Sequence, residues 1–376
     1  MTVDTVGVVG GGQLGRMLGE AAAPLGIDLV VSDPTPAAPA ARVAEQLVGG
    51  FDDPETVRAL AERADVLTYE IELADPDVLE RVGEETGTSV HPAPKTLRLI
   101  QDKLVQKRRL AEAGVPVPAF RPVASVGDLR EAIEEFGAPV MLKAREGGYD
   151  GRGTVRIDGP EEAPAAIEAI EGPAMVEEFV PFDCELAMMG CRGDGETDAF
   201  PVTETIHEAA ILRETVSPPR VPESVRERAR RVARDVLAVM EGRGVFGIEL
   251  FAADGEILLN EIAPRPHNSG HWTIEGCHTS QFEQHLRGVA GLPLGTTERR
   301  CPTALSNLLG TVEDPRPATL EGRASALATD RLALHWYGKD EVRPLRKMGH
   351  VTLPGAGASP EELLGAVREA RAELSA

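Results

Sequence analysis

The chain has 376 residues, of which 42% are hydrophobic and 27% are charged, a composition typical of a soluble globular protein. Its 61 acidic residues outnumber its 39 basic ones, and the formal net charge of −22 disfavours general binding to nucleic acids, because phosphate backbones would be repelled. The sequence has no run of about 18 apolar residues, which excludes a membrane-spanning helix.

The basic residues are mostly arginines, since only six lysines occur, at positions 95, 103, 107, 143, 339 and 347. An acid-rich, lysine-poor surface suits a cytoplasm at high salt, where self-repulsion is screened. A GC-rich genome would explain the arginines but not the excess of acids, so we expect a halophilic source. Residues 1–9 lack the regions of a secretory leader, and the cysteines lack CxxC spacing, so we expect a cytoplasmic protein with reduced thiols.

The first hundred residues alternate short apolar strands with helices. The expected elements are strands at Thr5–Val9, Ile27–Ser32 and Val66–Glu70, helices at Leu14–Leu25 and Pro54–Arg63, and a further strand from Val90. This alternation predicts a parallel sheet with covering helices, and Pro92 and Pro94 mark its end.

The rest of the chain mixes helices and strands less regularly. The expected helices are Lys103–Glu112, Leu129–Phe136, Glu223–Met240 and Ser359–Leu374, the last with a capping-box pattern. The expected strands are Val140–Ala144, Thr154–Ile157, Ala174–Val180, Glu185–Met189, Phe246–Phe251 and Ile257–Ile262. Past Pro293 the pattern predicts short strands and turns before the closing helix.

A glycine motif follows the first strand. Gly10, Gly12 and Gly15 match the GxGxxG fingerprint, and Asp33 ends the next strand, where such folds bind ribose. The motif fits a nicotinamide cofactor, but also any strand–helix unit that places a phosphate at a helix N-terminus. We expect Gly12 and Gly15 to serve a mononucleotide, and an NAD-dependent oxidoreductase stays open as an alternative.

A second glycine-rich segment, GGYDGRG at 147–153, lies between two predicted strands. Its glycines permit close approach of the backbone to phosphate oxygens, and Lys143 on the preceding strand can reach an α- or β-phosphate. It is not a Walker A sequence. An ordinary glycine-rich hairpin is the structural alternative, but Asp150 and Arg152 among four glycines exceed what a turn needs.

Two glutamates are placed on the arms of a predicted hairpin. Asp254 and Gly255 form the turn, which brings Glu249 level with Asn260 or Glu261. Two carboxylates and an amide carbonyl on neighbouring strands are hard oxygen ligands that suit Mg²⁺ bound with nucleotide phosphates. A pair of solvent-facing strand residues is the structural alternative, but the polar run that follows Glu261 has no evident structural task.

Two loops concentrate basic and polar residues in this acidic chain. The first holds Arg265, His267, Asn268 and His271, and the second holds Tyr337, Lys339, Arg343, Arg346 and Lys347. Such clusters predict an anionic ligand, although a rim of surface salt bridges is the structural alternative. Zinc is disfavoured because Gly270 and the nearby prolines oppose a helix that would carry the HxxxH spacing.

Together these segments resemble the ATP-grasp superfamily and, within it, the 5-(carboxyamino)imidazole ribonucleotide synthases of purine biosynthesis. The likeness runs in order through GVVGGGQLGRM, GGYDGRG, VEEFV, GIELF, NEIAPRPHNSGHW and LHWYGKDEVRPLRKMGH, and so covers nearly the whole chain. It implies an α/β and α+β fold with a Rossmann-like parallel-sheet domain at 1–98, an ATP-grasp domain at 99–294 whose lid lobe is at about 115–173, and a small C-terminal domain at 295–376.

The resemblance also implies a reaction and a site. ATP, bicarbonate and 5-aminoimidazole ribonucleotide would react on a homodimeric enzyme with Mg²⁺. The residues implied for ATP are Lys103, Lys143, Glu177, Phe179, Val180, Glu185, His207 and Asn260, and those for Mg²⁺ are Glu249, Glu261 and Asn260. Lys103 stands where this family commonly has arginine, so the charge is kept but not the fork geometry.

The remaining implied residues surround the other two substrates. Arg265, His267, Asn268 and Lys339 would surround bicarbonate and act in catalysis. The residues implied for the ribonucleotide are Gln13, Leu14, Glu70, Tyr149, Asp150, Arg152 and Arg346. Another ATP-grasp ligase, such as a formate-dependent glycinamide ribonucleotide transformylase, stays open as an alternative because it would share the ATP site.

Overall fold

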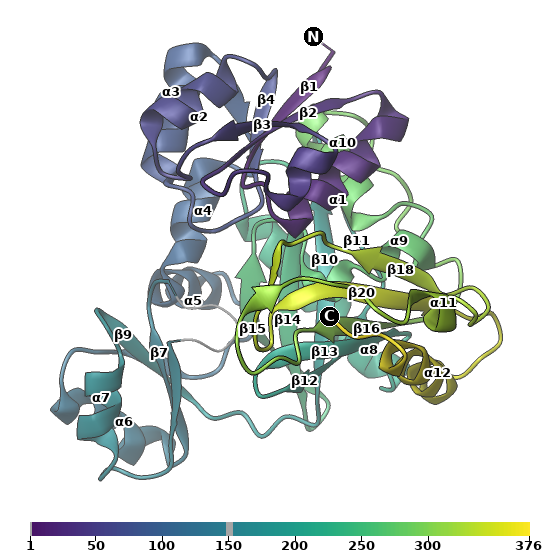
Figure 1. Cartoon of the computed structure of the whole chain (residues 1–376). Coiled ribbons are helices and arrows are strands. Elements are labelled where there is room, and N and C mark those ends of the chain that lie inside the picture. Colours follow the sequence, from purple (N-terminus) through teal and green to yellow (C-terminus); the bar gives the residue numbers. More distant parts are fainter. Residues whose placement is uncertain (1, 148–152) are drawn as a thin grey trace.

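The computed structural model describes residues 2–147 and 153–376, so the predicted site residues Tyr149, Asp150 and Arg152 lie outside the described residues. Figure 1 shows three parts. An N-terminal domain at one end and a small lobe with α6 and α7 at the other flank a body built on a large sheet. No helix of the described chain is long and apolar enough to cross a membrane.

The N-terminal domain contains a parallel sheet in the order β3-β2-β1-β4-β5. Its elements are β1 (Thr5–Val9), α1 (Gln13–Ala22), β2 (Asp28–Asp33), β3 (Glu45–Val48), α2 (Pro54–Ala61), β4 (Val66–Tyr69), α3 (Pro76–Thr86) and β5 (Ser89–Val90). The predicted parallel sheet with covering helices is confirmed. Short 3-10 turns follow at Ala23–Leu25 and Pro39–Arg42.

A helix from much later in the chain covers this domain. Leu286 and Val289 of α10 (Gln281–Ala290) join Leu14 and Leu18 of α1 in one buried cluster. Burial of four such aliphatic side chains contributes several kcal/mol at roughly 1.5–3 kcal/mol each. The contact fixes the N-terminal glycine turn relative to the central body.

The lobe is a small antiparallel sheet in the order β6-β9-β7-β8, backed by two helices. Its elements are β6 (Phe120–Val123), α6 (Val126–Phe136), β7 (Val140–Ala144), β8 (Thr154–Ile157), α7 (Ala163–Ala169) and β9 (Ala174–Glu178). It is joined to the N-terminal domain through α4 (Pro94–Gln101) and α5 (Lys103–Glu112). The predicted strand at Val140–Ala144 and helix at Lys103–Glu112 have the expected bounds.

The described residues form a nine-stranded central sheet whose main path is β15-β14-β10-β12-β13-β16-β20-β18, with β11 beside β10. The strands are β10 (Cys184–Arg192), β11 (Thr197–Ala199), β12 (Thr203–Glu208), β13 (Ile211–Ser217), β14 (Gly244–Ala253), β15 (Glu256–Ala263), β16 (Thr303–Leu309), β18 (Ala333–Trp336) and β20 (Lys347–Pro354). Because β16 pairs with β13, the C-terminal strands extend this sheet.

Two long helices, α8 and α12, pack on different strands of the central sheet. α8 (Glu223–Val239) buries Val225, Ala229 and Val232 against β10, β14 and β15. α12 (Pro360–Ala372) packs on β16 and β20, and its predicted capping box between Ser359 and Glu362 is present. The short elements are α9 (Thr273–Gly276), α11 (Arg323–Ala326), a 3-10 turn at Asn268–Gly270, and the strand pair β17 (Arg316–Pro317) and β19 (Glu341–Val342).

Candidate active site

The β14–β15 hairpin brings two carboxylates side by side. Asp254 and Gly255 have φ of 50° and 77°, as a tight hairpin turn requires, and Glu249 pairs directly with Glu261. The register shifts by one residue next to this pair, which leaves Asn260 as an extra residue on β15. The bulge therefore keeps Asn260 and Glu261 half-buried on the same side, away from the core on the other face of the strand.

The two hairpin carboxylates have opposite electrostatic environments. Burial raises the pKa of Glu249 to about 7, and the adjacent negative charge of Glu261 adds to this increase. Burial also acts to raise the pKa of Glu261, but the ion pair with Lys103 outweighs it and leaves that pKa below its ordinary value. The Glu261 side chain is 47% exposed, so a bound cation could reach it.

This donor set fits Mg²⁺. Burial is the main cause of the raised pKa of Glu249, the neighbouring charge of Glu261 adds to it, and a bound divalent cation would offset both effects. In the described part of the chain, no group of three or more His, Cys, Asp or Glu side chains could hold a metal. Mg²⁺ is commonly bound by one or two carboxylates together with substrate phosphates, and the hairpin supplies two carboxylates next to the Asn260 amide.

Lys107 and Lys143 lie beside the hairpin, as Lys103 does, and both contact one buried glutamate. Glu177 on β9 is 3% exposed and accepts a hydrogen bond from Lys143 Nζ at 2.7 Å, and Lys107 Nζ lies 3.3 Å from its other oxygen. Lys107 also donates to the Leu259 carbonyl on β15 at 2.9 Å. Burial alone would raise the pKa of Glu177, but the charges of Lys107 and Lys143 lower it to about 2. The buried carboxylate is thus ionised and ties the lobe to the central sheet.

The segment between the lobe and the central sheet carries the residues predicted for the adenosine. Val180 is buried, and the guanidinium of Arg156 lies 4.8 Å from the Phe179 ring centroid. Glu185 on β10 and His207 on β12 are joined by a 2.7 Å contact between Oε2 and Nδ1. Burial lowers the pKa of His207, but the contact with Glu185 outweighs it, so the net pKa is raised.

The predicted bicarbonate residues lie after β15, and most have protein partners. Arg265 is paired with Glu72 at 2.8 Å. His267 Nδ1 lies 2.8 Å from Ser269 Oγ and 3.7 Å from Glu249 Oε1, which places the ring beside the hairpin carboxylates. Burial lowers the pKa of His267 well below its ordinary value, and Arg265 adds to this effect, so the ring is neutral.

Asn268 forms a buried amide pair with an asparagine of the C-terminal strands. Asn307 Nδ2 donates to Asn268 Oδ1 at 2.8 Å, and Asn268 Nδ2 donates back to Asn307 Oδ1 at 3.1 Å. Asn307 also donates to the Leu212 carbonyl at 3.0 Å. This network fixes the loop after β15 against β13 and β16.

The first glycine turn is closed by the chain's own carboxylates. The Gly12 N–H donates to Glu70 Oε1 at 2.5 Å, and the Gly11 N–H donates to Asp33 Oδ2 at 3.0 Å. A Cβ on Gly10 would lie 2.5 Å from Glu70 Cγ, which explains the glycine there. Burial raises the pKa of Glu70 to about 7, against the lowering effect of the Gly12 hydrogen bond. A phosphate at this turn would meet N–H groups that already have acceptors.

Two other residues predicted for the ribonucleotide lie at the start of α1. Gln13 is half-buried, whereas Leu14 is 7% exposed and belongs to the α1–α10 core. Leu14 can therefore offer a ligand little beyond its backbone.

The C-terminal basic residues lie against the N-terminal domain. Lys339 Nζ donates to the Lys347 carbonyl at 2.7 Å, and Arg16 of α1 donates to the Tyr337 carbonyl at 3.2 Å. Lys347 also lowers the pKa of Glu249, so its charge reaches the hairpin carboxylates. Arg346 Nη1 donates to the Glu341 carbonyl at 2.7 Å and is half-buried.

Several residues of this region were not predicted. They are Arg16, Glu72, Lys107 and Asn307, whereas Lys347 belongs to the second basic cluster that the sequence predicted. The lysines had a usable signal: Lys95 pairs with Glu241 on the exposed surface, whereas the other five lysines of this arginine-rich chain occur in the two groups described above. Lys107 also follows Lys103 by one helical turn, so both face one side of α5. Arg16, Glu72 and Asn307 have no such signal, because their roles depend on contacts across long sequence separations.

Three family descriptions match successive parts of the chain. They are a ribonucleotide synthetase preATP-grasp domain at residues 3–101, an ATP-grasp domain at 108–282, and a phosphoribosylaminoimidazole carboxylase C-terminal domain at 303–362. The fold and the site thus define an ATP-grasp enzyme, and the predicted three-part architecture is confirmed. The C-terminal match also separates this chain from the transformylase and oxidoreductase alternatives, which do not predict it.

Similar proteins place the chain in one family. The N5-carboxyaminoimidazole ribonucleotide synthase of Synechococcus elongatus is 41% identical over 364 residues, which cover 96% of this chain and 92% of that protein. The crystal structure of the Thermotoga maritima synthetase has a TM-score of 0.89 and 42% identity, covering 100% of this chain and 99% of that one. The chain belongs to the N5-carboxyaminoimidazole ribonucleotide synthase family, ATP-dependent enzymes of purine biosynthesis.

A further solved relative carries ligands. The synthase from Aspergillus clavatus in complex with ADP and 5-aminoimidazole ribonucleotide has a TM-score of 0.89 and 34% identity, covering 98% of this chain and 97% of that chain. Fungal and plant phosphoribosylaminoimidazole carboxylases also match, and this chain spans about two thirds of their length.

Proposed function

We propose that this chain carboxylates 5-aminoimidazole ribonucleotide with ATP and bicarbonate through carboxyphosphate. A bicarbonate oxygen would attack the γ-phosphorus and release ADP, and the mixed anhydride would then break down to CO₂ and phosphate. The amine of the ribonucleotide would add to the CO₂ and lose a proton. The observation that supports this proposal most is the hairpin pair Glu249 and Glu261, which lies next to lysines on one side and His267 on the other.

The ATP phosphates would lie over the hairpin. Mg²⁺ at Glu249, Glu261 and Asn260 would neutralise phosphate charge and align the γ-phosphoryl group. Lys143 would bind phosphate oxygens. Glu177, which is ion-paired with Lys107, accepts a hydrogen bond from Lys143 and would orient its ammonium group. Lys103 would exchange part of its contact with Glu261 for a phosphate.

Bicarbonate and the ribonucleotide would occupy the space beyond the hairpin. Arg265 would hold bicarbonate and is oriented by Glu72, while the neutral ring of His267 would offer a hydrogen bond there. Asn268 would contribute from its amide pair with Asn307. A closed site would protect carboxyphosphate from water.

The ribonucleotide phosphate would be bound by the C-terminal basic residues. Arg346 and Lys339 lie in the loops where Arg16 meets Tyr337, so the phosphate would sit between the N-terminal and C-terminal parts of the chain. Glu70 would face the ribonucleotide from the glycine turn. Tyr149, Asp150 and Arg152 keep their predicted role in covering this substrate.

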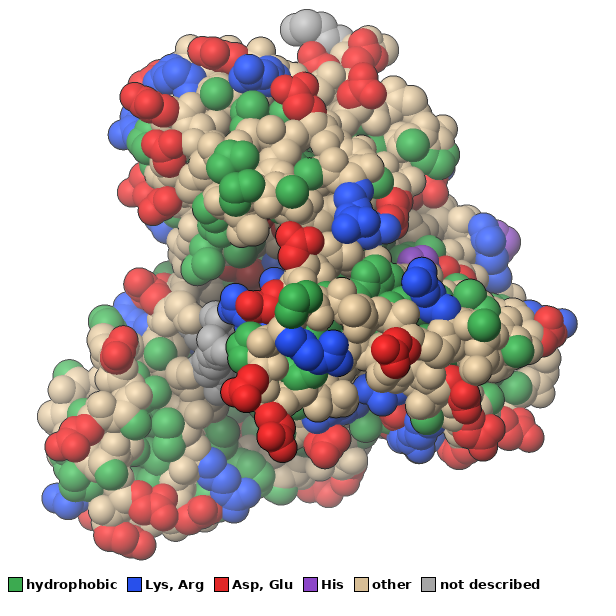
Figure 2. Space-filling model, in the orientation of Figure 1, with side chains coloured by type: hydrophobic (Ala, Val, Ile, Leu, Met, Phe, Trp, Pro, Cys, Tyr) green, Lys and Arg blue, Asp and Glu red, His purple; other side chains and the backbone are tan. Residues whose placement is uncertain are grey.

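We also propose a cytoplasmic homodimer from a salt-rich cell. The dimer rests on likeness to the family, and light scattering of the intact chain measures it. The salt adaptation rests on 61 acidic against 39 basic residues, and Figure 2 shows acidic side chains on each part of the visible face.

The test is the ratio of ADP to carboxylated product. The wild-type chain should release one ADP per product, and only with bicarbonate and 5-aminoimidazole ribonucleotide both present. Lys339→Ala should form more ADP than product, because carboxyphosphate would hydrolyse before the amine captures CO₂. Arg346→Ala should raise KM for the ribonucleotide by about tenfold or more, since a charge-assisted phosphate contact is worth roughly 1.5–3 kcal/mol. Lys95→Ala, on the exposed surface, is the matched control.

A ratio of one with unchanged KM in both variants would contradict the roles of Lys339 and Arg346. Absence of product from the wild-type chain with all three substrates would contradict the function itself.

A further inference from the structure

A pocket with arginines and prolines in its walls lies beside α8 and contains none of the candidate active-site residues. It has a volume of about 350 Å³ and is lined by Pro201, Val202, Pro218, Pro219, Arg226, Arg230, Glu298 and Arg299. α8 packs on the face of the central sheet that carries Ile248 and Leu250, whereas Glu249 lies between them and faces the other side. The sheet therefore separates this pocket from the candidate active site.

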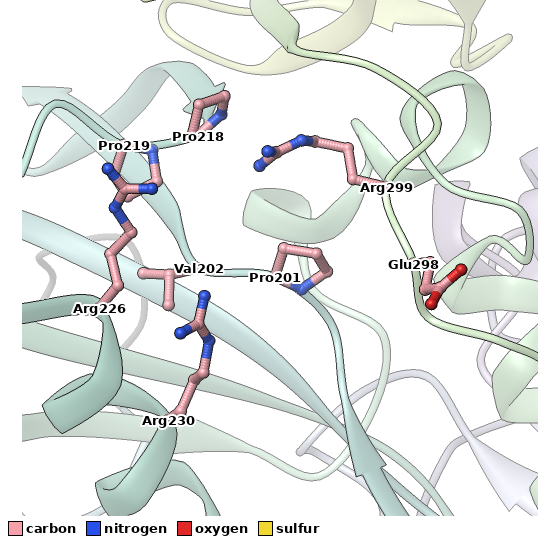
Figure 3. A pocket seen from close by; sticks show the side chains of 8 residues that line it. All are labelled: Pro201, Val202, Pro218, Pro219, Arg226, Arg230, Glu298 and Arg299. Atoms are coloured by element: carbon pink, nitrogen blue, oxygen red, sulfur yellow. The ribbon is translucent and has the colours of Figure 1, made fainter. Parts of the chain in front are cut away.

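Three guanidinium groups share this pocket with few counter-charges. Arg226 and Arg230 both pair with Glu223, at 3.1 and 2.6 Å. Arg299 donates to Ser217 Oγ at 3.2 Å, and within the described residues it has no carboxylate at ion-pair distance. Figure 3 shows the three guanidinium groups directed toward the space between the prolines, while the Glu298 carboxylate points away from them.

Of the three guanidinium groups, Arg299 has the least favourable electrostatic environment, because Arg226 and Arg230 are both paired with Glu223. Burial lowers the pKa of Arg299 below its ordinary value; the nearby thiols of Cys277 and Cys301 oppose this effect, and the positive charges of Arg226 and Arg230 add to it. The chain as a whole has 61 acidic and 39 basic residues, so a place with three arginines beside two glutamates, Glu223 and Glu298, departs from its average. An anion in the pocket would relieve the repulsion among the guanidinium groups.

The chemistry of the walls indicates which anion fits. The planar guanidinium fork matches phosphate oxygens, and arginine is favoured where phosphate is bound by two parallel hydrogen bonds. The side chains of Pro201, Pro218, Pro219 and Val202 form an apolar wall that suits a flat organic group. A volume of about 350 Å³ lies within the range of small-molecule sites.

We propose that this pocket is a second ligand site, which binds a small phosphomonoester with its phosphate on Arg226, Arg230 and Arg299 and its organic part against the prolines. The site is separate from the reaction centre, so a bound ester would act on the enzyme from the opposite face of the central sheet. Because α8 also packs on the strands that carry Glu249 and Glu261, occupancy of the pocket has a direct structural route to them.

The test uses calorimetric titration of the full chain in a low-chloride buffer. The probes are adenosine 5′-monophosphate, ribose 5-phosphate and inorganic phosphate, with a non-hydrolysable ATP analogue and Mg²⁺ present to occupy the ATP site. The variant Arg230→Gln/Arg299→Gln removes two of the phosphate contacts. Arg231→Gln is the matched control, because Arg231 lies on α8, is exposed, and does not line the pocket.

The double variant should raise Kd for adenosine monophosphate at least about tenfold at this site, while Arg231→Gln leaves it unchanged. Basal kcat should be the same in all three proteins. If the double variant does not fold, as judged by circular dichroism, the exposed Arg230→Gln alone should still raise Kd. Binding that is identical in the wild type and the variants, or no saturable binding outside the active site, would overturn the proposal. Equal affinity for inorganic phosphate would overturn the role of the prolines.

Discussion

Removal of the Lys107 charge is the sharpest test of how the lobe is held. Lys107→Met keeps the length of the side chain but leaves Glu177, 3% exposed, with Lys143 as its one ion-pair partner among the described residues. The difference between about 2 and the ordinary 4.5 in the pKa of Glu177 corresponds to about 3 kcal/mol, shared between the two lysines. Burial lowers the pKa of Lys107 to about 8, so the cost of burying this lysine offsets part of that gain, and the expected loss for the variant rests on the carboxylate that it leaves uncompensated. Loss of one partner of a buried pair typically costs about 3–5 kcal/mol. We expect Lys107→Met to lose about 3 kcal/mol of unfolding free energy at pH 7.

The pH dependence provides a second check. Because the pKa of Glu177 is lowered by folding, its stabilisation is present above about 4.5 and is lost as the pH falls toward 2. The difference between wild type and Lys107→Met should therefore narrow below about pH 4.5. Urea unfolding at pH 7 and pH 4 measures both quantities.

Two further variants serve as controls. Lys95→Met breaks an exposed ion pair with Glu241 and should have little effect. Lys107→Met/Glu177→Gln should recover part of the loss, because the uncompensated carboxylate is gone. A loss below about 1 kcal/mol for Lys107→Met, or a loss equal to that of Lys95→Met, would refute the reasoning.

Three other outcomes are expected. Glu261→Gln should lower kcat by about 10²-fold with a steeper dependence on Mg²⁺, and near-normal activity at limiting Mg²⁺ would remove the metal assignment. Glu70→Gln should raise the melting temperature at pH 8 but not at pH 5. The pKa of Glu70 is about 7 in the folded state, so its ionisation destabilises the folded protein above that pH. Equal shifts of the melting temperature at both pH values would contradict this. Melting temperature of the wild type should rise from dilute buffer into molar KCl, as the Debye length falls to about 3 Å; a flat or falling temperature would contradict salt adaptation.

Local patterns in the sequence were sufficient to predict the strands and helices that carry the candidate site. The alternation of strands and helices predicted the N-terminal parallel sheet, and Asp254-Gly255 predicted the hairpin that pairs Glu249 with Glu261. These features depend on neighbouring residues and short-range backbone geometry, so they are readable from spacing alone. The resemblance to a known family implied the reaction, because secondary-structure propensities carry no information about chemistry.

Long-range contacts had to be seen in the structure. Three contacts join segments that no local pattern links. They are the pairing of β16 with β13, the packing of α10 on α1, and the ion pair of Lys107 with Glu177. The same holds for the carboxylates that occupy the glycine turn, since Glu70 meets Gly12 across 58 residues. Which polar groups face one another depends on how the sheets and helices pack, and burial then sets their charge states. The sequence alone predicted which residues form the candidate active site, whereas the tertiary structure decided their partners and the direction of their pKa shifts.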